Sequence, residues 1–117
     1  MKNLILTLAF TSAAFAATPS QTFVGQISDS QCAFNIHSKT GSHQEMTVNH
    51  TMGNTEAECV QACVHSGGQY VLVTPKKVYK LSDQKQPADF AARKVKVVGT
   101  VDPKSNTIKV KTITAAE

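Results

Sequence analysis

The sequence VKVVGTVDPKSNTIKVKTI, residues 95–113, decides the fold. Valine and isoleucine alternate with lysine and threonine on both sides of the segment DPKSN at 102–106. A period of two is typical of strands that bury one face, and Asp, Pro, Ser and Asn are turn-forming residues. The stretch therefore predicts an antiparallel pair of strands at 95–101 and 107–113.

The segment before this pair predicts a second hairpin and a short helix, so residues 69–114 as a whole are expected to be rich in β-structure. Residues 70–73 and 78–81 carry β-branched and aromatic side chains, and a proline-containing turn separates them. Pro87 is well placed as the first residue of a short helix over 87–94, because proline fits the first helical position.

A first strand is predicted at 22–27, where Gly25 indicates a bulge or a close backbone approach. Residues 28–30, Ser-Asp-Ser, are expected to form a turn. Five strands with a helix between the third and the fourth is the order of an OB-type barrel. The fold class is therefore mainly β (α+β), a small five-stranded OB-like barrel. A five-stranded sheet with one face covered by a helix is the alternative.

Residues 55–66 predict one helix, inserted between the first and second strands. Thr55 followed by Glu58 has the form of a capping box, and the glycine pair at 67–68 is a helix stop signal. The helix carries two of the three cysteines of the chain, Cys59 and Cys63.

The three cysteines are candidates for a common site. Cys59 and Cys63 are four residues apart and share a helix face, with Cβ atoms about 5–6 Å apart. A disulfide requires roughly 3.5–4.5 Å between Cβ atoms, so the pair is not expected to bond to each other. Both are expected to face Cys32. A disulfide from Cys32 to one of them would staple the preceding loop to the core and contribute on the order of 2–4 kcal/mol.

The alternative for the same sulfurs is a metal site. Three thiolates and one imidazole complete a tetrahedral shell suited to zinc, and copper(I) also accepts such soft ligands. The segment 34–54, predicted as a long loop, supplies His37 as the preferred fourth ligand and His43 as the second choice. His65 is instead expected to act as a cation near a helix C-terminus. No other cofactor is expected.

The N-terminus has the form of an export signal. Residues 1–17 contain a short positive start, an apolar run and a small-x-small pattern that ends at Ala16. Cleavage is expected near Ala16 or Ala17, which leaves a single domain at 18–117 in the periplasm or outside the cell. No transmembrane segment is expected in the mature chain, because the apolar run is too short to span a bilayer.

The charge distribution raises a second binding hypothesis. The chain has 12 Lys and Arg against 8 Asp and Glu, and most of the basic residues follow residue 74. Spread lysines are ordinarily the solvated faces of strands. The alternative hypothesis is that Lys96, Lys109 and Lys111 bind an anionic polymer or surface. Nucleic acid is not expected as the partner, since the sequence shows no aromatic stacking platform and export argues against it.

An enzyme is not expected. The sequence has no Cys-x-x-Cys motif, no paired carboxylates at useful spacing, no Ser/His/Asp signature and no phosphate-binding loop. These absences leave a binding or structural module as the interpretation.

Several segments together resemble a known family. They are Ser-Asp-Ser-x-Cys at 28–32, Glu-Cys-x-x-x-Cys at 58–63 and the strand segments at 70–73, 77–81 and 95–101. In this combination the chain resembles a family of small secreted bacterial proteins of unknown function. The resemblance implies export, a single domain and a three-cysteine pattern, and it implies no activity.

Overall fold

The computed structural model describes residues 19–33 and 54–116. The predicted signal segment, His37 and His43 lie outside these ranges. In chain order the described elements are the strand β1 (Gln21–Asp29), the helices α1 (Ser30–Ala33) and α3 (Glu56–His65), the strands β2 (Tyr70–Val73) and β3 (Val78–Leu81), the 3₁₀ helix η2 (Gln86–Phe90), and the strands β4 (Lys94–Asp102) and β5 (Thr107–Ala115).

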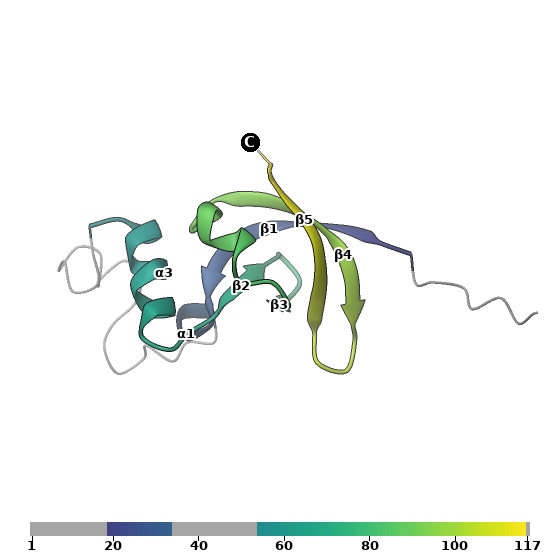
Figure 1. Ribbon diagram of the computed structural model, residues 1–117, viewed down its shortest axis with the longest axis horizontal. Coiled ribbons are helices and arrows are strands. Elements are labelled where there is room, and N and C mark those ends of the chain that lie inside the picture. Colours follow the sequence, from purple (N-terminus) through teal and green to yellow (C-terminus); the bar gives the residue numbers. More distant parts are fainter. Residues whose placement is uncertain (1–18, 34–53, 117) are drawn as a thin grey trace, which may run out of the picture.

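The five strands close into a barrel in the order β1-β2-β3-β5-β4, and β4 returns to β1 (Figure 1). Both predicted hairpins are present as the antiparallel pairs β2–β3 and β4–β5. The strands β3 and β5 pair in parallel. This order, with α3 between β1 and β2, confirms the OB-like barrel predicted from the strand pattern.

The strand β1 bends around the barrel because it changes partners along its length. Its first part, from Gln21 to Gln26, pairs with β4, and its last part, from Gln26 to Asp29, pairs with β2. At the bend a Cβ atom on Gly25 would lie 2.3 Å from the carbonyl oxygen of Val73. No side chain fits there, so the close backbone approach predicted at Gly25 is confirmed.

The seam between β3 and β5 is completed by side chains. Only two residue pairs join these strands. Beyond them the Ser82 hydroxyl accepts a hydrogen bond from the Val110 amide, and the Gln86 side-chain oxygen accepts one from the Ile113 amide, each at 3.0 Å. The strand β3 is too short to offer backbone carbonyl acceptors to these two amides, so the side chains of Ser82 and Gln86 accept their hydrogen bonds instead.

Two local predictions were wrong. The helix expected at 87–94 is the 3₁₀ helix η2, which ends at Phe90, and a positive φ of 60° at Ala92 turns the chain into β4. The turn expected at 28–30 does not form, because β1 continues through Asp29 by pairing with β2 and α1 begins at Ser30. Tertiary pairing overrode the local turn preference of Ser and Asp in this segment.

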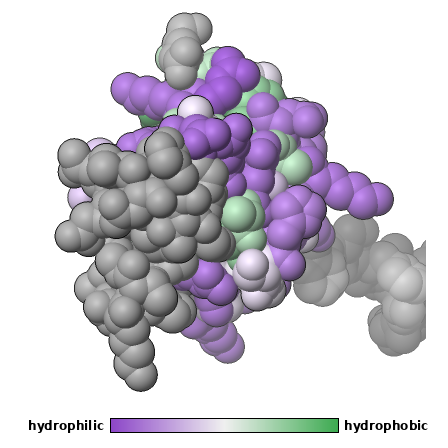
Figure 2. Space-filling model, turned by 90° about the vertical axis from the view of Figure 1, so that its left-hand side faces the viewer, coloured by the Kyte–Doolittle hydropathy of each residue, from purple (hydrophilic) through white to green (hydrophobic). Residues whose placement is uncertain are grey.

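The core fills the barrel and extends toward α3. The core is one cluster of ten buried residues, most of them from strands, such as Ile27, Leu72, Val95 and Ile108. Val60 of α3 belongs to the same cluster. The helices α1 and α3 lie together at one end of the molecule (Figure 1). Figure 2 shows this end, where hydrophilic side chains predominate on the described surface and hydrophobic ones appear as small separate patches. None of the helices in the described ranges has the length and apolar character needed to cross a bilayer.

Candidate functional site

The helix α3 begins after an N-cap at Thr55, as the sequence predicts. The Thr55 hydroxyl accepts a hydrogen bond from the Glu58 amide at 3.2 Å. The Glu58 carboxylate accepts one from the amide of Asn54, one residue before the cap. The predicted capping box is therefore present with its returning bond shifted by one residue, and it fixes the rotation of α3 about its axis.

The same helix ends in a Schellman motif. The Gly67 amide donates to the Val64 carbonyl at 3.1 Å, and the Gly68 amide donates to the Cys63 carbonyl at 3.0 Å. Gly67 has a φ of 106°, a conformation that favours glycine. The stop signal predicted from the glycine pair is confirmed, and it places Cys63 in the last turn of α3.

Asp29 organises the segment that carries Cys32. Its side chain is fully buried, because Asp29 follows Ile27 by two residues and so faces the same inner side of β1. The Asp29 Oδ1 atom accepts a hydrogen bond from the Cys32 amide at 2.9 Å, which is an N-cap contact for α1. The carboxylate thereby fixes the position of Cys32 directly after the strand.

Backbone contacts tie α1 to the segment that follows α3. The Ser30 amide donates to the Gln69 carbonyl at 2.8 Å, and the Ser30 hydroxyl accepts from the Gln69 amide at 3.0 Å. A Cβ atom on Gly68 would lie 3.5 Å from the Cγ atom of Gln31. The short helix therefore lies against the C-terminal end of α3, the end at which Cys63 is placed.

The structure brings the three cysteines together with Asp29, and we call these four residues the thiol cluster. Cys59 and Cys63 are fully buried, and Cys32 is half-buried. The three thiols lie close enough to Asp29 for its negative charge to act on the pKa of each of them. All three cysteines are thiols in this structure rather than members of a disulfide.

The environment of the thiol cluster keeps the thiols protonated. Burial, followed by the negative charge of Asp29, raises the pKa of Cys63 to about 12. The same two causes, in the same order, raise the pKa of Cys32. Burial also raises the pKa of Cys59, against a lowering contribution from its hydrogen bond with Cys63. Reactive cysteines have lowered pKa values in electropositive, accessible surroundings, and the thiol cluster is the reverse of such a site.

A metal site does not form among the described residues. No group of three or more His, Cys, Asp or Glu within 19–33 and 54–116 has an arrangement that could hold an ion. His65 is exposed in the last turn of α3, at the C-terminal end of the helix where the sequence places it.

The three candidate lysines are all exposed on the outer face of the β4–β5 hairpin. Lys96 precedes the buried Val97 and Lys109 follows the buried Ile108, so both side chains point outward. Lys111 lies in the irregularity where the register shifts between Val98 and Gly99. A hollow of about 340 Å³ beside this irregularity is lined by Ser20, Gly99, Thr100, Lys109, Val110 and Lys111.

Asp29 is the member of the thiol cluster that the sequence argument missed. The signal was present, because an Asp three residues before Cys32 has the spacing of an N-cap. The sequence predicts a turn at residues 28–30, and a turn residue is normally solvated. Its burial depends on the pairing of Asp29 with Tyr70 of β2, which is a long-range contact.

Comparison with known proteins matches part of the chain to a family. Residues 64–116 match the model of a family described as "Protein of unknown function (DUF5818)". The matched segment runs from the end of α3 through β5, so it contains the three candidate lysines and none of the cysteines. It agrees with the resemblance to a family of unknown function. No curated protein and no solved structure was found to match the chain.

Proposed function

We propose that the protein is an exported, non-enzymatic binding or structural module in which a disulfide between Cys32 and Cys63 staples α1 to α3. The observation that carries this proposal is the convergence of the three sulfurs, from two separate helices, on the buried Asp29 carboxylate. In an oxidising compartment such neighbouring thiols form disulfides that persist.

Cys63 is the partner of Cys32 because of where α1 lies. The contacts of Ser30 and Gln31 are with Gln69 and Gly68, just beyond the end of α3. Cys59 lies one helical turn farther from this end. The remaining combination, Cys59 with Cys63, requires two Cβ atoms at helical i, i+4 spacing to approach by about 1–2 Å. Cys59 is therefore left as the buried thiol.

The pKa values support a structural rather than a catalytic role for the sulfurs. The thiolate is the form that attacks disulfides, and burial raises the pKa of Cys59, the thiol that the staple leaves unbonded. A buried Cys59 thiol with a raised pKa is a poor nucleophile toward the neighbouring disulfide. The staple is therefore expected to be stable rather than exchanging.

Three single variants, Cys32→Ser, Cys59→Ser and Cys63→Ser, test the staple. A disulfide closing the Cys32–Cys63 loop stabilises by roughly 3–4 kcal/mol in the chain-entropy account. We expect Cys32→Ser and Cys63→Ser to lower the melting temperature of the oxidised protein by similar, large amounts. We expect Cys59→Ser to change it far less. Reduction should remove the difference between Cys32→Ser and the unsubstituted protein.

The metal hypothesis predicts a different pattern in the same variants. If Cys32, Cys59 and Cys63 bind zinc or copper with His37 or His43, each substitution should release a stoichiometric ion, and all three should damage stability alike. The metal content of the purified unsubstituted protein and of each variant therefore distinguishes the metal hypothesis from the disulfide staple. Three equally damaged variants that lose an ion would contradict the staple.

A second candidate function is binding of an anionic polymer. The supporting observation is that Lys96, Lys109 and Lys111 share the outer face of one hairpin. Replacing all three by Gln should weaken binding to polygalacturonate and reduce its salt dependence, while Lys80→Gln/Lys85→Gln/Arg93→Gln, at three exposed positions outside the hairpin face, serves as a charge-matched control. Equal losses in both triple variants would mean that net charge alone, and not this face, attracts the polymer.

A further inference from the structure

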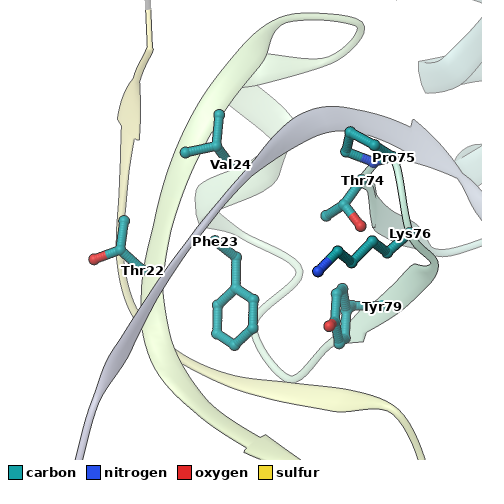
Figure 3. A pocket seen from close by; sticks show the side chains of 7 residues that line it. All are labelled: Thr22, Phe23, Val24, Thr74, Pro75, Lys76 and Tyr79. Carbon is teal, nitrogen blue, oxygen red and sulfur yellow. The ribbon is translucent and has the colours of Figure 1, made fainter.

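A second site lies away from the thiol cluster, where β1 passes the turn between β2 and β3. This hollow of about 260 Å³ is lined by Thr22, Phe23, Val24, Thr74, Pro75, Lys76 and Tyr79. Figure 3 shows the rings of Phe23 and Tyr79 side by side, with the Lys76 ammonium group pointing toward the space above them. One of the seven lining residues is basic and none is acidic.

Two aromatic rings form the apolar part of this hollow. The centroids of Phe23 and Tyr79 are 5.1 Å apart, with ring planes tilted by 57°. Both side chains are half-buried and pack against the core, which holds the rings in place. Val24, the next residue of β1, points away from the two rings, so Phe23 and Tyr79 alone supply the aromatic surface (Figure 3). The hollow thus offers fixed aromatic surface to a ligand.

The positive part of the hollow is held by a rigid turn. The Thr74 amide and hydroxyl both donate to the Lys77 carbonyl, at 3.0 Å and 2.8 Å, and the Thr74 hydroxyl accepts from the Lys77 amide at 3.2 Å. Pro75 restricts the backbone of the same turn. The Lys77 Nζ atom lies 5.5 Å from the Tyr79 ring centroid. Two ammonium groups are therefore presented beside the aromatic pair.

We propose that this hollow binds a small organic acid that carries a single ring. The ring packs on Phe23 and Tyr79, and the carboxylate binds the Lys76 ammonium group, with Lys77 as a second source of positive potential. A ligand with one ring is favoured over a flexible chain, because the ring loses less of its own conformational entropy on binding.

The size of the hollow sets the size of the ligand. A volume of about 260 Å³ is just below the range of roughly 300–1,000 Å³ that is usual for sites of drug-sized ligands. One ring with its acid group fits it. The hollow shares no lining residue with the one beside Lys109 and Lys111, so substitutions at the two places test the two proposals separately.

Benzoate is the probe, titrated into the purified full chain and followed by two-dimensional amide NMR. We expect saturable shifts centred on Phe23, Thr74 and Tyr79, with a dissociation constant on the order of 1 mM for so few ligand atoms. Benzamide, which keeps the ring without the charge, and acetate, which keeps the charge without the ring, should each bind more weakly than benzoate.

Matched variants locate the interaction. Lys76→Gln should weaken benzoate binding about three- to fivefold, as expected for one partly exposed ion pair, and Tyr79→Leu should weaken it further. Lys104→Gln, an exposed lysine in the β4–β5 turn, should leave it within about twofold. Because Tyr79→Leu also alters packing, its melting temperature is measured first and Lys76→Gln carries the test. Equal binding of benzamide and benzoate, equal effects of Lys76→Gln and Lys104→Gln, or shifts centred on Lys109 and Lys111 would each overturn the proposal.

Discussion

The fully buried carboxylate of Asp29 accepts a hydrogen bond from the backbone amide of Cys32 at 2.9 Å. One side chain thus caps α1 and stands beside the thiols of the cluster. Burial is the largest cause of the raised pKa of Cys63, and the charge of Asp29 is the second. The local structure of Cys32 and the ionisation of the sulfurs therefore depend on the same residue.

Asp29→Asn should separate the two roles. An asparagine oxygen still accepts from the Cys32 amide, so the cap is retained, whereas the negative charge is lost. In the reduced protein we expect the pKa of Cys32 and of Cys63 to fall, though not to the ordinary value, because burial remains. The measurement is the pH dependence of iodoacetamide alkylation, resolved by peptide mass. Asp102→Asn, at the exposed end of β4, is the control, and an unchanged alkylation profile for Asp29→Asn would contradict the account.

The stability of the reduced protein should fall at alkaline pH. The folded state raises the pKa of Cys63 from 9.0 to about 12, so it favours the protonated thiol. The stabilisation is fully present below about pH 9 and is lost as the pH rises through about 12. Urea unfolding of the reduced protein at pH 8 and pH 10.5 measures the loss. Cys63→Ser, also reduced, should lose less over this interval, and an identical pH dependence in both proteins would count against the assignment.

Gly25 should not tolerate even a methyl group. The Cβ atom of Gly25→Ala would lie 2.3 Å from the Val73 carbonyl oxygen, which belongs to the backbone of the neighbouring strand and cannot rotate away. We expect a destabilisation of about 2–4 kcal/mol, measured by urea unfolding. Gln21→Ala, exposed at the start of the same strand, should change stability by less than about 0.5 kcal/mol. Comparable effects of the two substitutions would show that β1 does not approach β2 so closely.

Gln86→Ala should open the seam of the barrel locally. It removes the acceptor of the Ile113 amide and leaves that donor without its protein partner. The expected cost is about 1–3 kcal/mol, with faster hydrogen exchange at Ile113 than at Val97 in the opposing strand β4. Gln61→Ala, exposed on α3, is the control. Unchanged protection of the Ile113 amide in Gln86→Ala would contradict a role for this side chain in closing β3 against β5.

The sequence was sufficient where neighbouring residues decide the structure. Alternation at 95–101 and 107–113 predicted β4 and β5, and the signals at Thr55 and Gly67 predicted both ends of α3. It was insufficient where distant segments decide. The burial of Asp29 requires β2, and the use of Gln86 as a substitute strand partner requires the parallel approach of β5. Neither of these long-range contacts can be predicted from the periodicity of the sequence.

The same distinction applies to the cysteines. Helical spacing alone placed Cys59 and Cys63 on one face, and the structure places both on the buried side of α3. The position of Cys32 beside them follows from the contacts of α1 with the residues after α3, which sequence spacing does not contain.

The most direct test of the staple is to map the cysteines of the exported protein by mass spectrometry. The purified protein is alkylated without reduction, digested and compared with a reduced sample. We predict one disulfide that links the peptides of Cys32 and Cys63, with Cys59 recovered as the alkylated thiol. A Cys32–Cys59 or Cys59–Cys63 disulfide, or three alkylated thiols, would contradict the proposal.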